Sequence, residues 1–346
     1  MFSGRIGVER QRLLEQYGGT PETENAVEQG LRWLSRQQGD DGSWSLQGPY
    51  EDGASRENRT AATAMALIAF TGDGHTHQAG DYRQNVEKGF HWLVNQQDEA
   101  GRFARKELSH HQAYTQAQAS IALSECYALT GDPTLKEPAQ LAIRYAEDAQ
   151  GPVGGWRYSP GAAGDLSVTG WYVMALQTGL AAKLTIDRSR IDKTMDFLNT
   201  VQTDDDGALY GYLPDLEATA GMTAEGLLCR QYLGWPHDHQ GLGRGVTRLA
   251  NEWRFDSNNM DVYYWFHASQ AIRHHGGIPW LAWNESMRVE LPGLQIQAGP
   301  EAGSWDPQPD RWGKSTGGRL FTTCFAIYCL EVYYRHQPLY TASVVE

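Results

Sequence analysis

Four ionisable side chains stand at or just inside the beginnings of apolar helical segments, where they could transfer protons. Asp165 and Asp261 stand four residues before two such segments, whereas Glu225 and His267 lie just inside two of them. A carboxyl removed from water keeps its proton to higher pH and can serve as a general acid. An imidazole titrates near neutrality and can serve as a base. These four residues are the predicted catalytic set.

Each carboxylate in this set also has a structural explanation. Aspartate is a preferred N-cap, because its side chain accepts hydrogen bonds from the first free backbone N–H groups of a helix. Asp165 and Asp261 suit that role. Glu225 could instead be paired with a neighbouring arginine, which would hold it ionised. The sequence leaves these alternatives open.

Aromatic residues cluster in the first turns of the same segments, and aromatic faces attract cations. Because residues of a helix point in several directions, about half of these rings must pack between helices instead of facing a ligand. Arg319 follows two glycines and could hold a phosphate or carboxylate with two hydrogen bonds, or form a structural salt bridge. The predicted ligand-binding residues are Tyr114, Trp171, Tyr263, Tyr264, Trp265 and Arg319.

The segments that position these residues are rich in alanine and apolar nearly all round, which is typical of helices buried on several sides. They span residues 60–72, 116–131, 169–180, 223–234, 265–277 and 323–334. Amphipathic segments alternate with them and carry charged outward positions such as Arg32 and Lys88. The chain therefore predicts two series of helices, one buried and one at the surface.

A repeated turn motif connects the two series. Residues 30–44 and 89–103 share a template of small, aromatic, aliphatic, glutamine, glycine and aromatic positions. The template recurs at 142–156, with one extra residue at 194–209, in degraded form at 242–257, and at 281–305, where Gln297 precedes Gly303-Ser304-Trp305. The glycine is expected to end the helix in a left-handed conformation. The glutamine should bond the exposed backbone of the turn, and the aromatic should pack beneath it.

Six helix pairs, repeating about every 50 residues, cannot bury their apolar faces separately but can close into a ring. We therefore predict an all-α fold, an (α/α)6 toroid with the apolar helices inside and the amphipathic helices outside. The predicted single domain spans residues 22–340, preceded by an N-terminal extension over 1–21 and followed by a tail over 341–346.

The repeat resembles a known one. The pattern QxxxGxW occurs as Gln38/Gly42/Trp44, Gln97/Gly101/Phe103 and Gln150/Gly154/Trp156. It is similar to the repeat of squalene–hopene cyclases and of protein prenyltransferase β subunits, the terpenoid cyclase and prenyltransferase superfamily. The resemblance covers about residues 22–340 and implies a toroid with a central cavity.

The catalytic motifs of that superfamily are incomplete in this chain. Its cyclases use a DxDDT acid motif, but the matching stretch keeps only Asp165 and Thr169, with Ser167 and Val168 replacing the two acidic residues. The segment that resembles the zinc-binding histidine region of the prenyltransferases has Thr322 at that place. We therefore expect no metal and no cofactor.

Composition excludes several classes of partner. The formal net charge is −13, from 29 basic and 42 acidic residues, which argues against nucleic acid and anionic membrane surfaces. No apolar run approaches the roughly 20 residues of a membrane span. The first residues lack the apolar core of a signal peptide, so we expect a cytoplasmic protein. The abrupt start also fits a piece of a longer chain.

Three functional hypotheses follow. The first is a terpenoid-cyclase-like enzyme, an isomerase or lyase that acts on a polyprenyl or other isoprenoid-like apolar substrate in a central cavity. The second is a non-catalytic toroid that binds an apolar ligand or a protein partner, which the missing motifs favour. The third is a polysaccharide lyase-like enzyme, because similar toroids host sugar chemistry. Whether the chain is an enzyme at all stays open at this level.

Overall fold

The computed structural model describes residues 2–103 and 111–340, and in these residues the chain is helical, with isolated β-bridges but no named strand. The predicted tail over 341–346 lies outside them. The outer helices are α2 (Pro21–Arg36), α4 (Arg83–Val94), α6 (Pro133–Asp148), α8 (Arg188–Val201), α10 (Gln240–Asn251) and α12 (Gly277–Gly293). The inner helices are α3 (Arg59–Gly72), α5 (Gln112–Thr130), α7 (Leu166–Ala181), α9 (Ala220–Tyr232), α11 (Val262–His275) and α13 (Gly318–Leu330).

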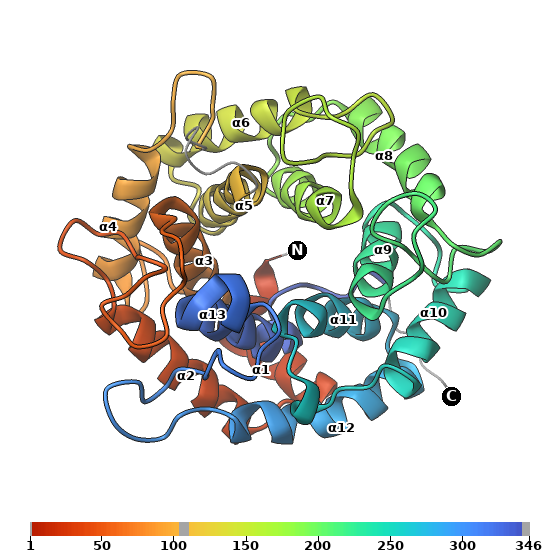
Figure 1. Ribbon diagram of the computed structural model, residues 1–346. Helices are drawn as coiled ribbons and strands as arrows, with labels where there is room; N and C mark the ends of the chain where they lie inside the picture. Colours follow the sequence, from red (N-terminus) through yellow and green to blue (C-terminus); the bar gives the residue numbers. More distant parts are fainter. Residues whose placement is uncertain (1, 104–110, 341–346) are drawn as a thin grey trace.

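The inner helices form a closed ring (Figure 1). Each inner helix contacts the next inner helix along the chain, and the last, α13, contacts the first, α3, so that the ring is closed. The outer helices surround this ring, and α12 contacts α2 to complete the second layer. The predicted all-α toroid of paired helices is therefore confirmed.

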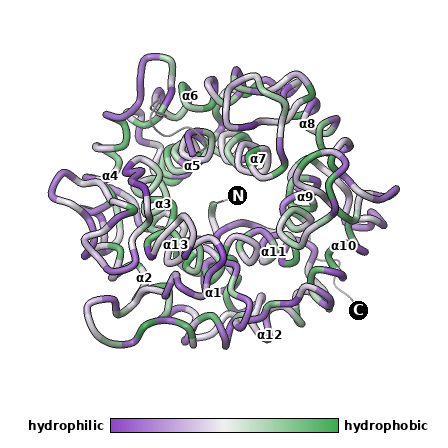
Figure 2. The backbone as a smooth tube through the Cα atoms, in the orientation of Figure 1, coloured by the Kyte–Doolittle hydropathy of each residue, from purple (hydrophilic) through white to green (hydrophobic). Residues whose placement is uncertain are grey.

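The two layers differ in how much of each helix surface is buried. The inner helices are buried on almost every side, as α3 and α7 show, because they contact both their ring neighbours and the outer layer. The outer helices bury one face, for example Val27, Leu31 and Leu34 of α2. Figure 2 shows that the loops around the rim are mostly hydrophilic. Removal of this apolar surface from water is the main driving force for closing the ring.

The glycines of the turn motif are left-handed as expected, but they do not end the outer helices, because α2, α4 and α6 already end six or seven residues before them. Gly42, Gly101 and Gly154 have φ values of +90°, +85° and +96°, a backbone region that favours glycine. The Nε2 of Gln38 donates hydrogen bonds to the carbonyl oxygen of Gly42 at 2.8 Å and to that of Asn85 on α4 at 2.8 Å. The glutamine therefore fixes its own turn and fastens it to the next outer helix.

The aromatic residue two positions after each of these glycines, Phe103 in one turn and tryptophan in the other two, is buried beneath its turn. Trp44 and Trp156 are buried, and their indole Nε1 groups each donate to a carbonyl of the preceding outer helix at 2.7 Å. The backbone N–H of Trp156 donates to the hydroxyl of Thr169 at 2.9 Å. Thr169 therefore joins the turn to inner helix α7.

The last repeat requires a correction. Gln295, and not Gln297, fills the glutamine position, because its Nε2 donates to Gly303 at 2.9 Å and to Ala26 of α2 at 2.8 Å. Gln297 donates only within its own loop, to the carbonyl of Gln295. The longer turn between Gln295 and Gly303 shifted the expected spacing, so the template aligned the wrong glutamine.

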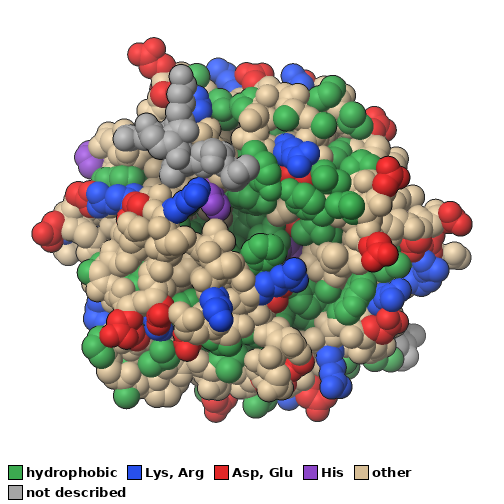
Figure 3. Space-filling model, in the orientation of Figure 1, with side chains coloured by type: hydrophobic (Ala, Val, Ile, Leu, Met, Phe, Trp, Pro, Cys, Tyr) green, Lys and Arg blue, Asp and Glu red, His purple; other side chains and the backbone are tan. Residues whose placement is uncertain are grey.

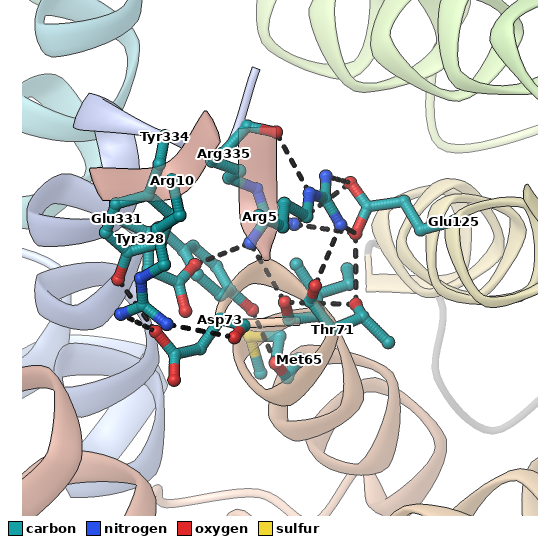
Figure 4. Close-up of polar contacts among 11 residues, drawn as sticks. Arg5, Arg10, Met65, Thr71, Asp73, Glu125, Tyr328, Glu331, Tyr334 and Arg335 are labelled. Atoms are coloured by element: carbon teal, nitrogen blue, oxygen red, sulfur yellow. Dashed lines mark hydrogen bonds and ion pairs between the residues drawn. The ribbon is translucent and has the colours of Figure 1, made fainter. Parts of the chain in front are cut away.

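The N-terminal segment packs against one end of the ring. A short 3-10 helix, η1 (Ser3–Arg5), and helix α1 (Gly7–Tyr17) lie there, as Figure 1 shows behind the ring. The fully buried Arg5 donates to both carboxylate oxygens of Glu125 on α5, at 2.9 and 2.8 Å, and to the carbonyl of Thr71 on α3 at 3.0 Å (Figure 4). Arg335 also contacts both Glu125 oxygens, at 3.0 and 2.9 Å.

Candidate functional site

The inner helices begin around a hollow on the face of the ring seen in Figure 3, which we call the mouth. Hydrophobic side chains line this hollow. At four of the helix starts a side chain accepts a hydrogen bond from the backbone N–H three residues later, a local arrangement that fixes where each helix begins. The capping residues are Asn58 for α3, Asp165 for α7, Thr219 for α9 and Asp261 for α11.

Asp165 and Asp261 are therefore N-caps. Oδ1 of Asp165 accepts from the N–H of Val168 at 2.8 Å, and Oδ1 of Asp261 accepts from the N–H of Tyr264 at 2.9 Å. Burial raises the pKa of Asp165 to about 6, and the backbone hydrogen bond and the nearby Arg157 oppose that shift. Burial also raises the pKa of Asp261. Both side chains hold helices in place at the edge of the mouth.

Glu225 lies differently, between two inner helices. It is 0% exposed and sits in the second turn of α9 against α7. The space for its carboxyl exists because residue 170 of α7 is glycine: a Cβ there would lie 2.2 Å from Oε1 of Glu225. Such a close approach of a carboxyl to a helix backbone is possible only where no side chain intervenes.

The surroundings of Glu225 favour its protonated form. Burial raises its pKa well above the ordinary value, and a hydrogen bond from Tyr263 only partly opposes this. The nearby basic group is an imidazole and not an arginine: Nε2 of His267 on α11 lies 3.5 Å from Oε1. Burial also lowers the pKa of His267 to about 4. Both groups are therefore neutral at neutral pH, because neither is solvated well enough to carry charge.

The tautomer of His267 follows from its other nitrogen. Nδ1 lies 2.9 Å from the backbone carbonyl oxygen of Tyr263, which can only accept, so Nδ1 carries the proton. Nε2 is then the free base that faces Glu225. Glu225 and His267 thus form a neutral acid and base pair.

A chain of hydroxyl groups leads from this pair toward the mouth. The hydroxyl of Tyr263 donates to the two oxygens of Glu225 at 3.3 and 3.2 Å. It also lies 2.6 Å from Oγ of Ser167, which in turn lies 3.0 Å from the hydroxyl of Tyr114. The indole Nε1 of Trp171 donates to the same Tyr263 oxygen at 3.2 Å. These residues come from α5, α7, α9 and α11, so four inner helices build one site.

The structure brings together Glu225, His267, Tyr114, Trp171 and Tyr263 of the residues expected from sequence. The other aromatic candidates on α11 point away from this cluster. Tyr264 donates to the backbone of Trp253, and Trp265 stacks on Phe255 with ring centroids 4.1 Å apart, so both pack toward the outer layer.

Arg319 has protein partners for its guanidinium. It contacts Asp52 at 2.9 Å and Glu301 at 3.7 Å, and it donates to the carbonyl of Glu51 at 3.0 Å. These contacts fasten the loop around residue 52 to the start of α13. Of the two explanations that the sequence left open, the geometry matches the structural salt bridge.

Sequence reasoning overlooked two polar residues. Ser167 was read only as the loss of an acid, yet its hydroxyl is the centre of the chain between Tyr114 and Tyr263. Asp310 is buried and accepts from the backbone of Val262 at 3.0 Å and of Gly313 at 2.6 Å. Burial raises its pKa to about 6. Asp310 lies in a loop outside the repeat template, so no periodic signal marked it.

No group of three or more histidine, cysteine, aspartate or glutamate residues in the described ranges is arranged to hold a metal ion. Thr322, at the place of the superfamily's histidine, donates to Asp310 at 3.2 Å.

The centre of the ring is largely filled. A cavity of about 20 Å³ lies inside the ring, and its lining includes the apolar Trp171, Met174 and Phe266 and the charged Glu125 and Arg335. Cavities that bind organic ligands are about 300–1,000 Å³. The described residues therefore leave space for about one water molecule there, and an extended ligand would have to occupy the mouth or displace side chains.

Solved structures share this architecture. The type II terpene cyclase MstE from Scytonema aligns with a TM-score of 0.61 and 15% identity over 90% of this chain and 98% of its own. The alpha-1,6-mannanase GH76A from Salegentibacter sp. HEL1_6 aligns with a TM-score of 0.60 and 12% identity over 90% and 98%. The fold is a terpenoid-cyclase-like toroid. At such identities the likeness concerns the fold alone, and two different chemistries share it.

No known protein family matches the sequence, and no curated protein matches it either. Within the described residues, the helices are too short or too polar for any of them to cross a lipid bilayer.

Proposed function

We propose that the mouth binds an isoprenoid-like apolar ligand and that Glu225 and Tyr263 supply a proton to it. One observation carries this proposal: Glu225 is a fully buried carboxyl with no cationic partner among the described residues, held instead between Tyr263 and His267. An unpaired carboxyl costs several kcal/mol to bury in ionised form, so it is kept as the neutral acid. Strongly shifted groups of this kind concentrate at functional sites.

The positions of Glu225 and Tyr263 give them different roles in the proton transfer. Glu225 is shielded from solvent, whereas Tyr263 is half-buried and lies closer to the mouth. A ligand would therefore accept its proton from the hydroxyl of Tyr263, whose O–H bond breaks as a bond to the ligand forms. The proton of Glu225 then passes to the Tyr263 oxygen, and the electron pair stays on the Glu225 carboxylate.

The raised pKa of Glu225 bears on the group that accepts the proton. A carboxyl of raised pKa carries its proton at neutral pH but is a weak acid, so it protonates a basic atom more readily than an isolated alkene. We infer that the ligand presents an oxygen, such as that of an epoxide, in place of an unactivated double bond.

Aromatic rings beside Tyr263 suit an apolar ligand that gains positive charge. Trp312 is 42% exposed, and its ring centroid lies 6.4 Å from that of Tyr263. Phe325 stacks on Tyr263 at 6.0 Å, and the half-buried Phe321 packs on Phe325 at 4.3 Å. Such faces attract a developing cation through their quadrupole. One fold neighbour, the terpene cyclase MstE, has been solved with geranylgeranyl dihydroxybenzoate as its substrate.

The mannanase neighbours raise sugar hydrolysis as an alternative, but the carboxylates here favour it less. That chemistry needs two carboxyl groups that face one sugar bond. Asp165 and Asp261 cap their helices, and Glu225 is buried behind Tyr263.

The test is incubation with squalene, oxidosqualene and geranylgeranyl diphosphate at acidic to neutral pH, followed by gas chromatography and mass spectrometry. We expect a new product from the epoxide, none from squalene, and loss of the product in Glu225→Gln. Asp261→Asn is the matched control, because asparagine caps a helix as well as aspartate. If no substrate gives a product, the catalytic proposal is wrong. Native mass spectrometry of the same samples then shows whether the toroid binds these ligands without converting them.

A further inference from the structure

We propose that Tyr114, Ser167 and Tyr263 form a directional proton relay that reloads Glu225 from the solvent at the mouth. This role rests on the proposed function, since a proton donor that turns over must be reprotonated. Glu225 itself has no exposed surface, so water cannot reach it directly.

The hydroxyl groups of the relay form a continuous chain of contacts from Tyr114 to Glu225. The hydroxyl of Tyr114 lies 3.0 Å from Oγ of Ser167, and Oγ lies 2.6 Å from the hydroxyl of Tyr263. That hydroxyl lies 3.2 Å from Oε2 of Glu225. The first two separations lie within the usual O–H···O range of about 2.5–3.0 Å and the last is slightly longer, so three proton hops connect Tyr114 to the carboxyl.

Trp171 fixes the direction of the relay. An indole N–H can only donate, and that of Trp171 donates to the Tyr263 oxygen at 3.2 Å. Once Glu225 is a carboxylate it can only accept, so Tyr263 donates to it, Ser167 donates to Tyr263 and Tyr114 donates to Ser167. All three hydroxyls then point the same way, toward the carboxyl. Trp171 acts as a positioning residue, because it occupies an acceptor site of the Tyr263 oxygen.

The two ends of the relay differ in solvent access. Tyr114 is half-buried, in the first turn of α5. Ser167 is 8% exposed, and Glu225 at the other end is 0% exposed. Protons can therefore be taken up at Tyr114 and stored at Glu225.

The reloading step balances. After a ligand has taken a proton, Glu225 is a carboxylate. The proton of Tyr263 moves to Glu225, that of Ser167 moves to Tyr263, and that of Tyr114 moves to Ser167. A hydronium ion of the solvent returns a proton to Tyr114 and leaves a water molecule. Every O–H bond that breaks is replaced, and one proton has passed inward.

The test is exchange of the Glu225 proton for deuterium, followed by infrared difference spectroscopy without any substrate. The carboxylic-acid C=O band that disappears in Glu225→Gln is assigned to Glu225, and its shift after mixing with D2O gives the exchange rate. We expect Ser167→Ala to slow this exchange by at least about ten-fold, because exchange must then wait for local opening of the site. Ser167→Thr, which keeps a hydroxyl, should restore a rate close to that of the wild type.

Two further variants make the result decisive. Tyr114→Phe removes the first hydroxyl and should slow exchange like Ser167→Ala, even if the latter folds poorly. Trp171→Phe should slow exchange less, since it removes the orienting bond but no relay group. Equal exchange rates in the wild type, Ser167→Ala and Tyr114→Phe would overturn the relay, as would absence of a Glu225 acid band. Failure to find a product would overturn the proposed function but not the relay, because exchange is measured without turnover.

Discussion

Single residues at the mouth divide into those that build helices and those that could move protons. Asp165 and Asp261 use their oxygens to begin α7 and α11, as an N-cap does. Glu225 begins no helix and has no cationic partner within residues 2–103 and 111–340, so stability alone does not account for a carboxyl at that position. Burying a carboxyl costs solvation free energy, and such buried acids concentrate at functional sites. Glu225 is therefore the single residue that most strongly indicates a function.

Gly170 tests whether the position of Glu225 matters. In Gly170→Ala the new Cβ would lie 2.2 Å from Oε1 of Glu225, so the carboxyl must move away from Tyr263. We expect this overpacking to lower the free energy of unfolding by about 1–3 kcal/mol and to weaken the Glu225 acid band. Gly221→Ala is the control, because nothing lies within 4 Å of its Cβ. Denaturant unfolding of both variants decides the comparison, and equal stability would contradict the crowding argument.

The protonation of Glu225 predicts a pH dependence of stability. Its pKa is raised in the folded state, so the folded protein binds the proton more tightly than the unfolded chain. The stability linked to this group is therefore fully present below its ordinary pKa and is lost as pH rises toward the folded value. Glu225→Gln removes this loss. Relative to the wild type, the variant should gain about 1.4 kcal/mol for each pH unit between the two pKa values.

Urea unfolding of Glu225→Gln and the wild type from about pH 5 to about pH 8 measures this difference. If the free energies of unfolding of the two proteins change with pH in the same way, Glu225 does not carry a proton in the folded state. Glu225 could then not be the proposed proton donor.

Only part of this site could be predicted from single residues. Glu225, His267, Tyr263 and Trp171 were identified by their places near helix starts. Their mutual contacts join separate helix hairpins, so no local spacing encodes them. Ser167 was overlooked because it was compared with the acid expected at its position, and its value as a hydroxyl depends on Tyr114 and Tyr263, which only the closed ring brings to it.

At the scale of elements, the repeat was predictable because each turn is local. The glutamine, glycine and aromatic of one turn lie within seven residues, as at 38–44, so their spacing is visible in the sequence. The starts of the inner helices were expected between one and five residues late, because the caps lie before the apolar residues that made the helices recognisable. The last turn was misaligned because its loop is longer.

The two glutamines of that turn give a direct comparison. Gln295→Ala should lower the free energy of unfolding by about 1–3 kcal/mol, since the carbonyls of Ala26 and Gly303 lose their partner. Gln297→Ala should change it by less than about 0.5 kcal/mol, because Gln297 bonds only its own loop. Thermal and denaturant unfolding of both variants measures the effects. An equal cost for the two substitutions would restore the original alignment of the repeat.

At the scale of the whole molecule, the ring is held at the end away from the mouth by ionic contacts from both chain ends. Arg5 near the N-terminus and Arg335 after the last inner helix both bond the carboxylate of Glu125, as Figure 4 shows. Glu331 adds an ion pair with Arg335 at 2.6 Å. The two cations on Glu125 lower its pKa despite complete burial. The repeat could not predict this cluster, because Arg5 and Arg335 lie outside the repeated segments.

This arrangement makes the N-terminal segment part of the folded ring, which a point substitution can test. Arg5→Leu removes one partner of a buried ion pair, and such a change costs about 3–5 kcal/mol. We expect the lower part of that range, because Arg335 still compensates Glu125. Arg12→Leu, which breaks an exposed pair with Glu9 on the same segment, should leave the free energy of unfolding almost unchanged. Denaturant unfolding measures both, and hydrogen exchange should show lost protection at the ends of α3 and α5 only in Arg5→Leu. If the two variants were equally stable, residues 2–17 would be a dispensable extension, and the ring would owe its closure to the helix repeats alone.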